Sequence, residues 1–178
     1  MKDRKLQGAE LGRITPDEYR ALPPSGIALV LDNIRSAHNV GSAFRSADAF
    51  RAEKVWLCGI CATPPSAEIH KTALGAEQSV PWAYEPDTAA LVSRLREDGW
   101  CIVSVEQTQH ALPLDSFHPE AGVRYALVFG NEVDGVRQDV VDASDFALEI
   151  PQWGSKHSLN VSVAVGVVLW QFRSGAAR

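Results

Sequence analysis

The chain has 178 residues, and its 17 Lys and Arg against 22 Asp and Glu give a formal net charge of −5. That length predicts a single domain, and a content of 46% hydrophobic and 22% charged residues excludes a disordered or fibrous chain. The acidic balance excludes a protein coated with basic residues. It does not exclude a local nucleic-acid site, because binding depends on a patch of charge rather than on the sum.

The first segment is polar and ends in Pro23-Pro24-Ser25-Gly26, which predicts an N-terminal arm or short helix over residues 1–25 and one domain over residues 26–178. The opening sequence MKDRKLQGAELGR lacks the apolar core of a secretory signal. No run reaches the roughly 18 apolar residues of a membrane span, so we expect no association with a membrane.

Apolar runs and helical patterns alternate after the arm. Residues 27–31 (IALVL) form a continuous apolar run, which is typical of a strand buried on both faces. The same criteria, with helix caps such as Ser66, predict strands over residues 27–31, 55–58, 80–84, 101–105, 125–129 and 146–150, and helices over residues 39–50, 66–74, 87–98, 136–141 and 158–172. This alternation predicts an α/β fold with a mostly parallel sheet flanked by helices.

The last predicted helix is apolar nearly all round, through the sequence VSVAVGVVLW at residues 161–170. One face of a sheet covers only one stripe of a helix. The pattern therefore has two interpretations, a central core helix or a helix that lies between its own sheet and a second subunit.

The three cysteines, Cys58, Cys61 and Cys101, form no paired framework, which favours the reducing cytoplasm. Cys58 and Cys61 match the CxxC pattern, but Ala-Thr-Pro-Pro follows them. That sequence indicates a loop rather than the helix N-terminus at which a redox thiolate lies. A zinc site would need two more ligands, and the sequence has no second CxxC, so we expect no metal.

Common nucleotide-binding and hydrolase motifs are absent from the sequence. The first predicted strand leads into DNIRSAHNVGSAFR rather than the G-x-G-x-x-G of a dinucleotide site. Residues 130–135 have the glycine spacing of a P-loop, but Val136 and Arg137 stand where Lys and Ser or Thr are required. No G-x-S-x-G supports a serine nucleophile.

Three polar segments nevertheless follow predicted strands, and the first contains Arg45. An arginine beside an apolar helix face is costly unless an anion pairs with it. Arg45 therefore has two interpretations, a surface arginine that pairs with Asp48 or Asp32, or a ligand for a phosphate.

The second and third polar segments are FGNEVDGV at residues 129–136 and IPQWGSKHSLN at residues 150–160. Ligands of open α/β sheets bind at the carboxyl ends of the strands, and glycine lets a ligand approach the backbone. Glu132 would then point at a ligand. The alternatives are a solvated turn around Glu132 and helix capping by Ser158 and Asn160.

Together and in this order, NVGSAFRSADAF, LVFGNEVDGV and IPQWGSKHSLNVSVAV resemble the three motifs of the SpoU/TrmH family of RNA 2′-O-ribose methyltransferases, within the SPOUT superfamily. The segment KTALGAEQ at residues 71–78 is similar to a family segment between motifs. The resemblance covers most of the chain from about residue 27 onward.

The resemblance implies a parallel α/β sheet whose C-terminal part forms a deep trefoil knot, a feature that periodicity alone does not predict because knots are very rare. It also implies S-adenosyl-L-methionine as the cofactor and a homodimer with the site near its interface, which favours the second interpretation of the last helix. The cofactor-binding residues that it implies are Glu106, Gly130, Ile150, Leu159 and Asn160.

The implied reaction is methylation of a ribose 2′-hydroxyl in structured RNA, either tRNA or rRNA. Arg45 is expected to hold an RNA phosphate and orient the hydroxyl, because an arginine that stays protonated is a poor base. Asn39 is expected to hold Arg45 or the substrate, and Glu132 to organise Asn39, Arg45 and their loop. The catalytic residues implied are Asn39, Arg45, Glu132, Ser158 and Asn160, and the substrate-binding residues are Arg35, Arg45 and Lys156.

Charge is spread unevenly along the chain. Residues 77–149 contain four basic and 14 acidic residues, whereas residues 150–178 contain three basic residues and no acidic one. This distribution predicts a confined RNA site, with Lys2, Arg4, Lys5 and Arg13 of the arm either contacting RNA or packing on their own domain. The rival hypotheses are a cofactor- or RNA-binding protein without catalysis and a small-molecule or thiol enzyme.

Overall fold

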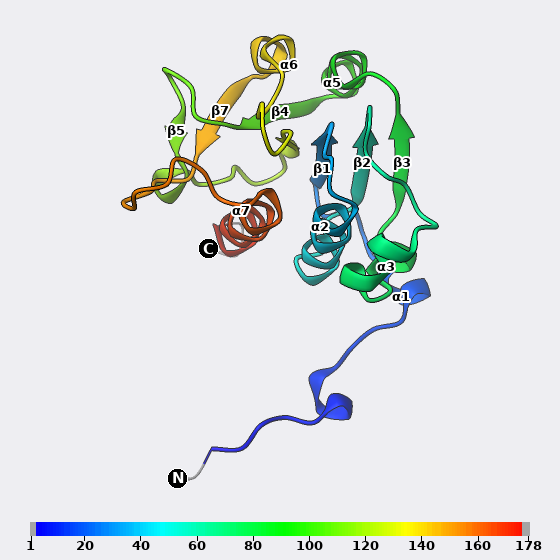
Figure 1. The fold of residues 1–178 in the computed structure, drawn as a ribbon. Helices are drawn as coiled ribbons and strands as arrows, with labels where there is room; N and C mark the ends of the chain where they lie inside the picture. The colour runs from blue at the N-terminus through cyan, green and yellow to red at the C-terminus, as the bar shows by residue number, and fades with distance from the viewer. Residues whose placement is uncertain (1–2, 176–178) are drawn as a thin grey trace.

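A parallel sheet forms the centre of the molecule (Figure 1). The computed structural model describes residues 3–175, apart from the side chains of residues 8 and 9, and in this part seven strands run in the order β3-β2-β1-β6-β4-β7-β5. Every pairing is parallel, which confirms the predicted fold class. The strands are β1 (Ile27–Asp32), β2 (Lys54–Cys58), β3 (Trp82–Glu85), β4 (Trp100–Val105), β5 (Leu112–Pro113), β6 (Arg124–Phe129) and β7 (Phe146–Glu149).

Helices cover both faces of the sheet (Figure 1). One face carries α2 (Ala37–Ala49), α3 (Ala67–Ala73), α4 (Ala76–Ser79) and α7 (Val161–Gly175), whose apolar side chains share one core. The other face carries α5 (Thr88–Glu97) and α6 (Gln138–Ala143), which pack in a second core. Short segments complete the chain, namely the 3-10 helices η1 (Gly8–Leu11) and η2 (Leu114–Ser116) and the helix α1 (Pro16–Ala21).

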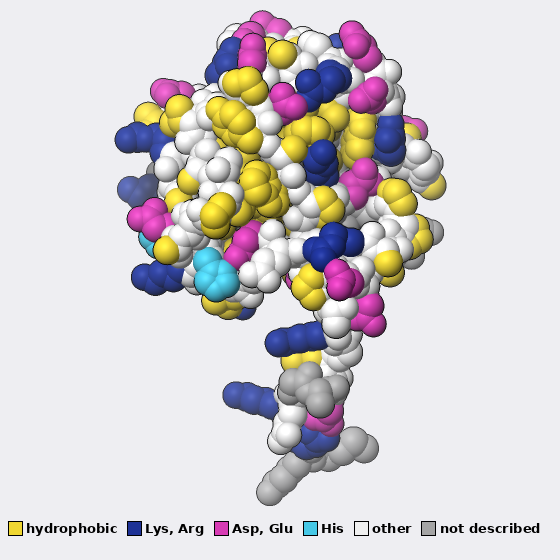
Figure 2. All heavy atoms as spheres, turned by 90° about the vertical axis from the view of Figure 1, so that its right-hand side faces the viewer, with side chains coloured by type: hydrophobic (Ala, Val, Ile, Leu, Met, Phe, Trp, Pro, Cys, Tyr) yellow, Lys and Arg dark blue, Asp and Glu magenta, His cyan; other side chains and the backbone are white. Residues whose placement is uncertain are grey.

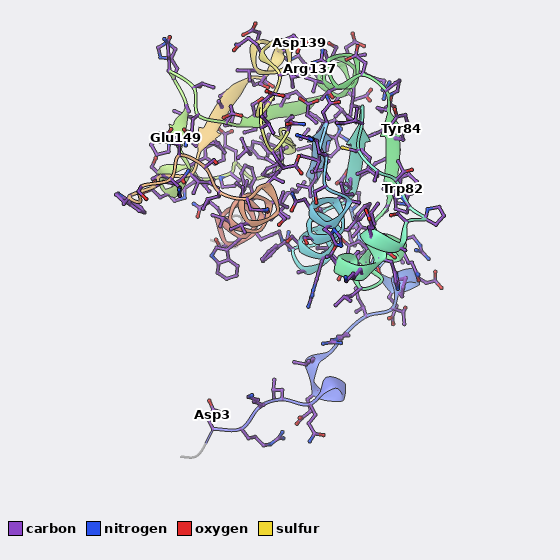
Figure 3. All side chains as sticks on the ribbon, in the orientation of Figure 1. Asp3, Trp82, Tyr84, Arg137, Asp139 and Glu149 are labelled. Atoms are coloured by element: carbon purple, nitrogen blue, oxygen red, sulfur yellow. The ribbon has the colours of Figure 1, made fainter. Side chains whose placement is uncertain are left out.

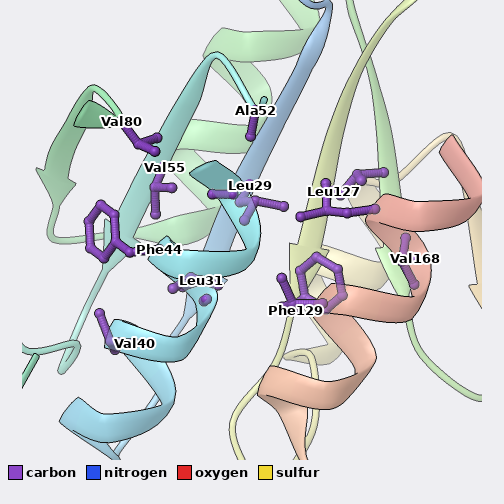
Figure 4. Close-up of a cluster of buried hydrophobic side chains, with 14 of the residues drawn as sticks. Leu29, Leu31, Val40, Phe44, Ala52, Val55, Val80, Leu127, Phe129 and Val168 are labelled. Carbon is purple, nitrogen blue, oxygen red and sulfur yellow. The ribbon is translucent and has the colours of Figure 1, made fainter. Parts of the chain in front are cut away.

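The two central strands supply both cores, as their continuous apolar runs predict. In β1, Leu29 and Leu31 lie in the core under α2 and α7, together with Leu127 and Phe129 of β6 (Figure 4). The alternate residues of both strands lie in the core under α5 and α6. Because β1 and β6 are buried on both faces, their ends occupy fixed positions from which loops can present polar groups.

Helix α7 buries one stripe and leaves another in solvent. Val165, Val168 and Phe172 are fully buried against the sheet, whereas Val163 and Trp170 are exposed. Packing within one chain therefore explains only the buried stripe of this apolar helix. That a second subunit covers the exposed stripe stays a prediction. None of the helices described between residues 3 and 175 is long and apolar enough to cross a membrane.

The N-terminal segment contains a short helix, α1, and an arm that projects from the body of the molecule (Figures 1 and 2). Thr15 and Glu18 form a capping box that starts α1. Buried Tyr19 attaches the helix to the domain, because its hydroxyl donates to the carbonyl of Ala52 at 2.8 Å. Arg4, Lys5 and Arg13 are exposed, Lys2 lies outside the described residues, and the arm's contact with RNA stays a prediction.

The starts of α2 and α7 differ from the prediction because of local capping, and α6 begins at Gln138 rather than at residue 136. Helix α2 begins at Ala37 rather than at residue 39, since the Ser36 side chain accepts from the Asn39 N–H. Helix α7 begins at Val161 rather than at residue 158, since the Asn160 side chain accepts from the Ser162 N–H at 2.8 Å. The sequence patterns also missed α4 and the two-residue strand β5, and the trefoil knot stays a prediction.

Candidate active site

The strand register brings the carboxyl ends of β4, β6 and β7 to one edge of the sheet. Val105 of β4 pairs with Phe129 of β6 and with Leu148 of β7. The next residues along the first two strands, Glu106 and Gly130, therefore emerge side by side. Because ligands of parallel sheets bind at the carboxyl ends of the strands, this edge is the place where a site is expected.

A cavity of about 480 Å³ lies at this edge. Buried apolar side chains, which include Phe129 and Leu148, line it together with polar residues. The predicted cofactor residues all line it, namely Glu106, Gly130, Ile150, Leu159 and Asn160. Glu132 and Ser158 line it as well, so the cavity collects predicted residues from two of the three motif segments.

The loop after β6 is held closed on itself. Asn131 and Gly135 exchange two backbone hydrogen bonds, of 3.0 and 2.9 Å. A Cβ atom on Gly130 would collide with the backbone of Gly135 and Val136, so only glycine fits there. Glu106, directly after β4, accepts from the Val136 N–H at 2.9 Å, which ties the loop to the end of the neighbouring strand.

A chain of hydrogen bonds joins all three motif segments. The carboxylate of Glu132 accepts from the Asn39 side chain at 2.9 Å and from the backbone N–H groups of Arg35 and Ser36, at 2.9 and 3.0 Å. The Asn39 amide oxygen in turn accepts from the Asn160 side chain at 3.2 Å. The network Glu132–Asn39–Asn160 thus connects the loop after β6, the start of α2 and the start of α7.

Arg45 lies outside this network and outside the cavity. It is exposed on α2 and lines a separate hollow with Ser42, Lys71 and Thr72. Within residues 3–175, it forms no ion pair or hydrogen bond, including with Asp48, so the surface-pair interpretation is wrong for the described chain.

The expected contacts of Asn39 and Glu132 with Arg45 are likewise not formed. Both side chains are satisfied within the network, and Asp32, the other proposed partner of Arg45, is fully buried and accepts from the Thr88 hydroxyl at 2.6 Å. Six residues separate Arg45 from Asn39 on α2, which places the two side chains on different turns of the helix.

The other predicted RNA-contacting residues flank the cavity. The side chains of Arg35 and Lys156 are both exposed, one before α2 and one in the loop between β7 and α7. That loop is anchored at His157, whose carbonyl accepts from the Gln107 side chain at 2.9 Å. Ser158 is exposed at the cavity wall and does not cap α7.

Comparison with known proteins decides the family. A family model described as the SpoU rRNA methylase family matches residues 26–170. The chain belongs to the SpoU rRNA methylase family. Its three motif segments, identified from sequence as SpoU/TrmH-like, are the segments that the network Glu132–Asn39–Asn160 joins.

Named relatives of this SpoU family member are similar over most of its length. It is 31% identical to the 23S rRNA (guanosine-2′-O-)-methyltransferase RlmB of Vibrio cholerae, over 95% of this chain and 72% of that protein. It is also 31% identical to RlmB of Vibrio vulnificus, over 87% of this chain and 62% of that protein. The structure of an AdoMet-bound rRNA methyltransferase from Sinorhizobium meliloti matches with a TM-score of 0.77 at 25% identity, over 89% of this chain and 60% of that one. The chain thus spans about three fifths to seven tenths of the length of these relatives.

Asn131 is a structural residue of the site that the sequence patterns missed. Its side chain donates to the Asn33 carbonyl at 2.7 Å and accepts from the Val133 N–H at 2.8 Å. It therefore shapes the loop after β6 and ties it to the end of β1. An asparagine directly after the strand-ending Gly130 is a signal for such a turn, and it could have indicated this role.

The thiols of Cys58 and Cys61 are buried and free. Burial raises the pKa of Cys58 to about 12 and that of Cys61 to about 11, so both stay protonated at neutral pH, whereas nucleophilic thiols need a lowered pKa. This SpoU family member therefore does not offer a thiol active site there. Among residues 3–175, no group of three or more His, Cys, Asp and Glu side chains is arranged to hold a metal ion.

Glu132 should make the stability of the protein depend on pH. Burial disfavours its charged form, but the hydrogen bonds from Arg35, Asn39 and Ser36 outweigh this and hold the pKa of Glu132 below its usual value of 4.5. A carboxyl whose pKa is lowered on folding stabilises the protein above its unfolded pKa, and that contribution is lost as the pH falls through the folded pKa. We expect Glu132→Gln to lower the free energy of unfolding by about 1 kcal/mol at pH 7.

The measurement is urea denaturation of the wild type and Glu132→Gln between pH 7 and pH 3. The difference between them should stay constant above about pH 5 and shrink toward zero below the folded pKa. A difference that persists unchanged at pH 3 would contradict a role for the charged carboxylate.

Proposed function

We propose that this SpoU family member transfers a methyl group from S-adenosyl-L-methionine to a ribose 2′-hydroxyl of ribosomal RNA. The observation that carries the proposal is the network Glu132–Asn39–Asn160, which joins three motif segments beside one cavity. The names of the RlmB relatives support ribosomal RNA and guanosine as the substrate class.

The cavity has the properties that the cofactor requires. Its volume of about 480 Å³ falls in the range of small-molecule sites, and its buried apolar lining residues suit a purine ring. Each carboxylate oxygen of Glu106 accepts one backbone hydrogen bond, from Gln107 or Val136. A carboxylate has about four acceptor positions, so Glu106 can still accept from the hydroxyls of a ribose.

The cofactor, when bound, supplies a methyl group already activated on a sulfonium. The protein then has to hold RNA and orient one hydroxyl. We assign phosphate binding to the exposed guanidinium of Arg45, with Arg35 and Lys156 as further contacts. Arg45 orients the hydroxyl rather than taking its proton, because its guanidinium stays protonated.

We also propose that the protein acts as a homodimer through α7. Trp170 on its exposed side contacts Phe50 edge to face, with ring centres 6.1 Å apart. Phe50 also lines the hollow that contains Arg45. The apolar stripe and the Arg45 hollow are therefore continuous, and a second copy that covers the stripe would bring the hollow of Arg45 into the interface.

The test is methyl transfer from a radiolabelled cofactor to unmodified 23S rRNA, 16S rRNA and total tRNA, each transcribed in vitro. We expect label in 23S rRNA as a 2′-O-methylated nucleotide, identified by nuclease digestion and mass spectrometry. Label only in tRNA would reassign the substrate, and label in no RNA, with the cofactor still bound, would support the non-catalytic alternative. Size-exclusion chromatography with light scattering tests the dimer, and a monomeric mass would contradict it.

A further inference from the structure

The loop between β7 and α7 presents its tip beside the cavity. The chain lines the cavity at Gln152, leaves it, and lines it again at His157. The four residues in between are all exposed, namely Trp153, Gly154, Ser155 and Lys156. This tip does not pack on its own domain, and a Cβ atom placed on Gly154 meets nothing within 4 Å.

Trp153 is 90% exposed, the highest value among the large hydrophobic side chains that the structure describes. An indole that stays in water does not contribute the large favourable free energy that its burial would give. No fold requirement explains the residue, because its side chain supports neither core. Its position next to the cavity-lining Gln152 instead points to a ligand.

We propose that Trp153 stacks on an unpaired nucleobase of the RNA substrate, with Lys156 contacting an adjacent phosphate. This inference rests on the proposed function and makes Trp153 a positioning residue for it. Stacking on aromatic side chains is the usual way in which proteins hold unpaired RNA bases, and it suits any base because each has a π face.

Charge complementarity favours RNA over a second copy of the chain. The tip contains one charged residue, the exposed Lys156, and no acidic residue, so a polyanion meets an attractive charge there. The neighbours of Trp153 at the tip are a glycine, a serine and a lysine, which is a polar setting. The exposed stripe of α7, with Val163, Val167 and Trp170, is by contrast continuous and apolar, which is typical of homodimer interfaces.

The inference has a kinetic consequence. A base held at the tip would place its RNA strand next to the cavity before the reaction, so Trp153 contributes to binding rather than to the reaction of bound RNA. Loss of the indole should therefore raise the KM for RNA more than it lowers kcat. A purely structural role would instead lower stability or cofactor affinity.

The experiment compares Trp153→Ala and Trp153→Phe with the wild type, using an unmodified 23S rRNA transcript as the probe. Filter binding should show a Kd for RNA about 5- to 100-fold higher for Trp153→Ala, the range that one stacked base provides. Trp153→Phe should recover most of the affinity, and the Kd for S-adenosyl-L-methionine should stay unchanged in both. The matched control is Tyr84→Ala, which removes a half-exposed aromatic from β3 at the far edge of the sheet from the end of β7 that Glu149 marks (Figure 3).

Each further outcome decides the inference. The inference is overturned if Trp153→Ala binds RNA as tightly as the wild type, or if Tyr84→Ala loses as much RNA affinity as Trp153→Ala. It is also overturned if the wild type binds no RNA. A change of molecular mass in Trp153→Ala would assign the residue to a subunit contact and also overturn it. If the wild type binds the transcript without methylating it, while Trp153→Ala loses affinity, the proposed function fails and the inference stands.

Discussion

Arg45→Ala is expected to abolish methyl transfer to RNA while the protein still binds S-adenosyl-L-methionine with a Kd within about twofold of the wild type. The separation of effects follows from geometry, because Arg45 lies in a hollow with Lys71 and Thr72 and does not line the cavity. A preorganised charged donor contributes on the order of 100-fold or more to a reaction rate. We therefore expect kcat/KM for RNA to fall by at least about 100-fold.

The measurements are calorimetric titration with the cofactor and methyl transfer to the 23S transcript. Arg45→Lys should recover only part of the activity, since lysine keeps the charge and loses the planar fork of donors. Arg96→Ala is the matched control, because Arg96 lies on α5, on the opposite face of the sheet, and pairs with Asp145 at 2.8 Å. Undiminished turnover of Arg45→Ala would remove this residue from the mechanism, and equal loss in Arg96→Ala would indicate a general effect of charge.

The sequence alone predicted the layers and the edge of the sheet that carries the site. A short continuous apolar run such as residues 27–31 is typical of a strand buried on both faces, and a glycine after such a run marks the end of the strand. That local reasoning placed Gly130 and Glu132 at the edge of the sheet where the structure has a cavity. It needed no knowledge of strand order, because the carboxyl ends of parallel strands share one edge.

Long-range contacts could not be predicted in this way. Glu132 and Asn39 are 93 residues apart in the sequence. They meet because β6 lies next to β1 in the sheet, and no local sequence pattern specifies this strand order. The position of Arg45 depends on where α2 begins, and the Ser36 cap shifted that start by two residues from the predicted one. Elements as short as β5 carry too few residues for any periodic pattern.

This difference between local patterns and long-range contacts also applies to the family resemblance. The resemblance indicated which residues belong to the site, but not which of them contact one another. It grouped Asn39, Arg45 and Glu132 as one catalytic set. The structure joins Asn39 to Glu132 through a hydrogen bond and leaves Arg45 in its own hollow. Residues predicted to serve one reaction do not have to form one cluster within one chain. The proposed homodimer would use the continuity between the Arg45 hollow and the exposed stripe of α7 to bring Arg45 to the site.

Gly130→Ala is expected to raise the Kd for S-adenosyl-L-methionine by about 5- to 100-fold. A Cβ at this position would collide with the backbone of Gly135 and Val136, and backbone cannot move aside as a flexible side chain can. Forcing a methyl group into a packed site costs about 1–3 kcal/mol. Here the loop after β6 would have to open, and that loop forms one wall of the cavity. Calorimetric titration measures the affinity, and urea denaturation shows how much stability is lost along with it.

Gly154→Ala is the matched control for this prediction. Neither glycine has a positive φ, so alanine is not strained at either position by its backbone conformation. The two substitutions add the same methyl group, one against backbone and one into open space. Gly154→Ala should therefore bind the cofactor as the wild type does. Equal loss in both variants would mean that chain flexibility rather than steric closeness controls the site, and unchanged affinity in Gly130→Ala would mean that the cofactor does not depend on this wall of the cavity.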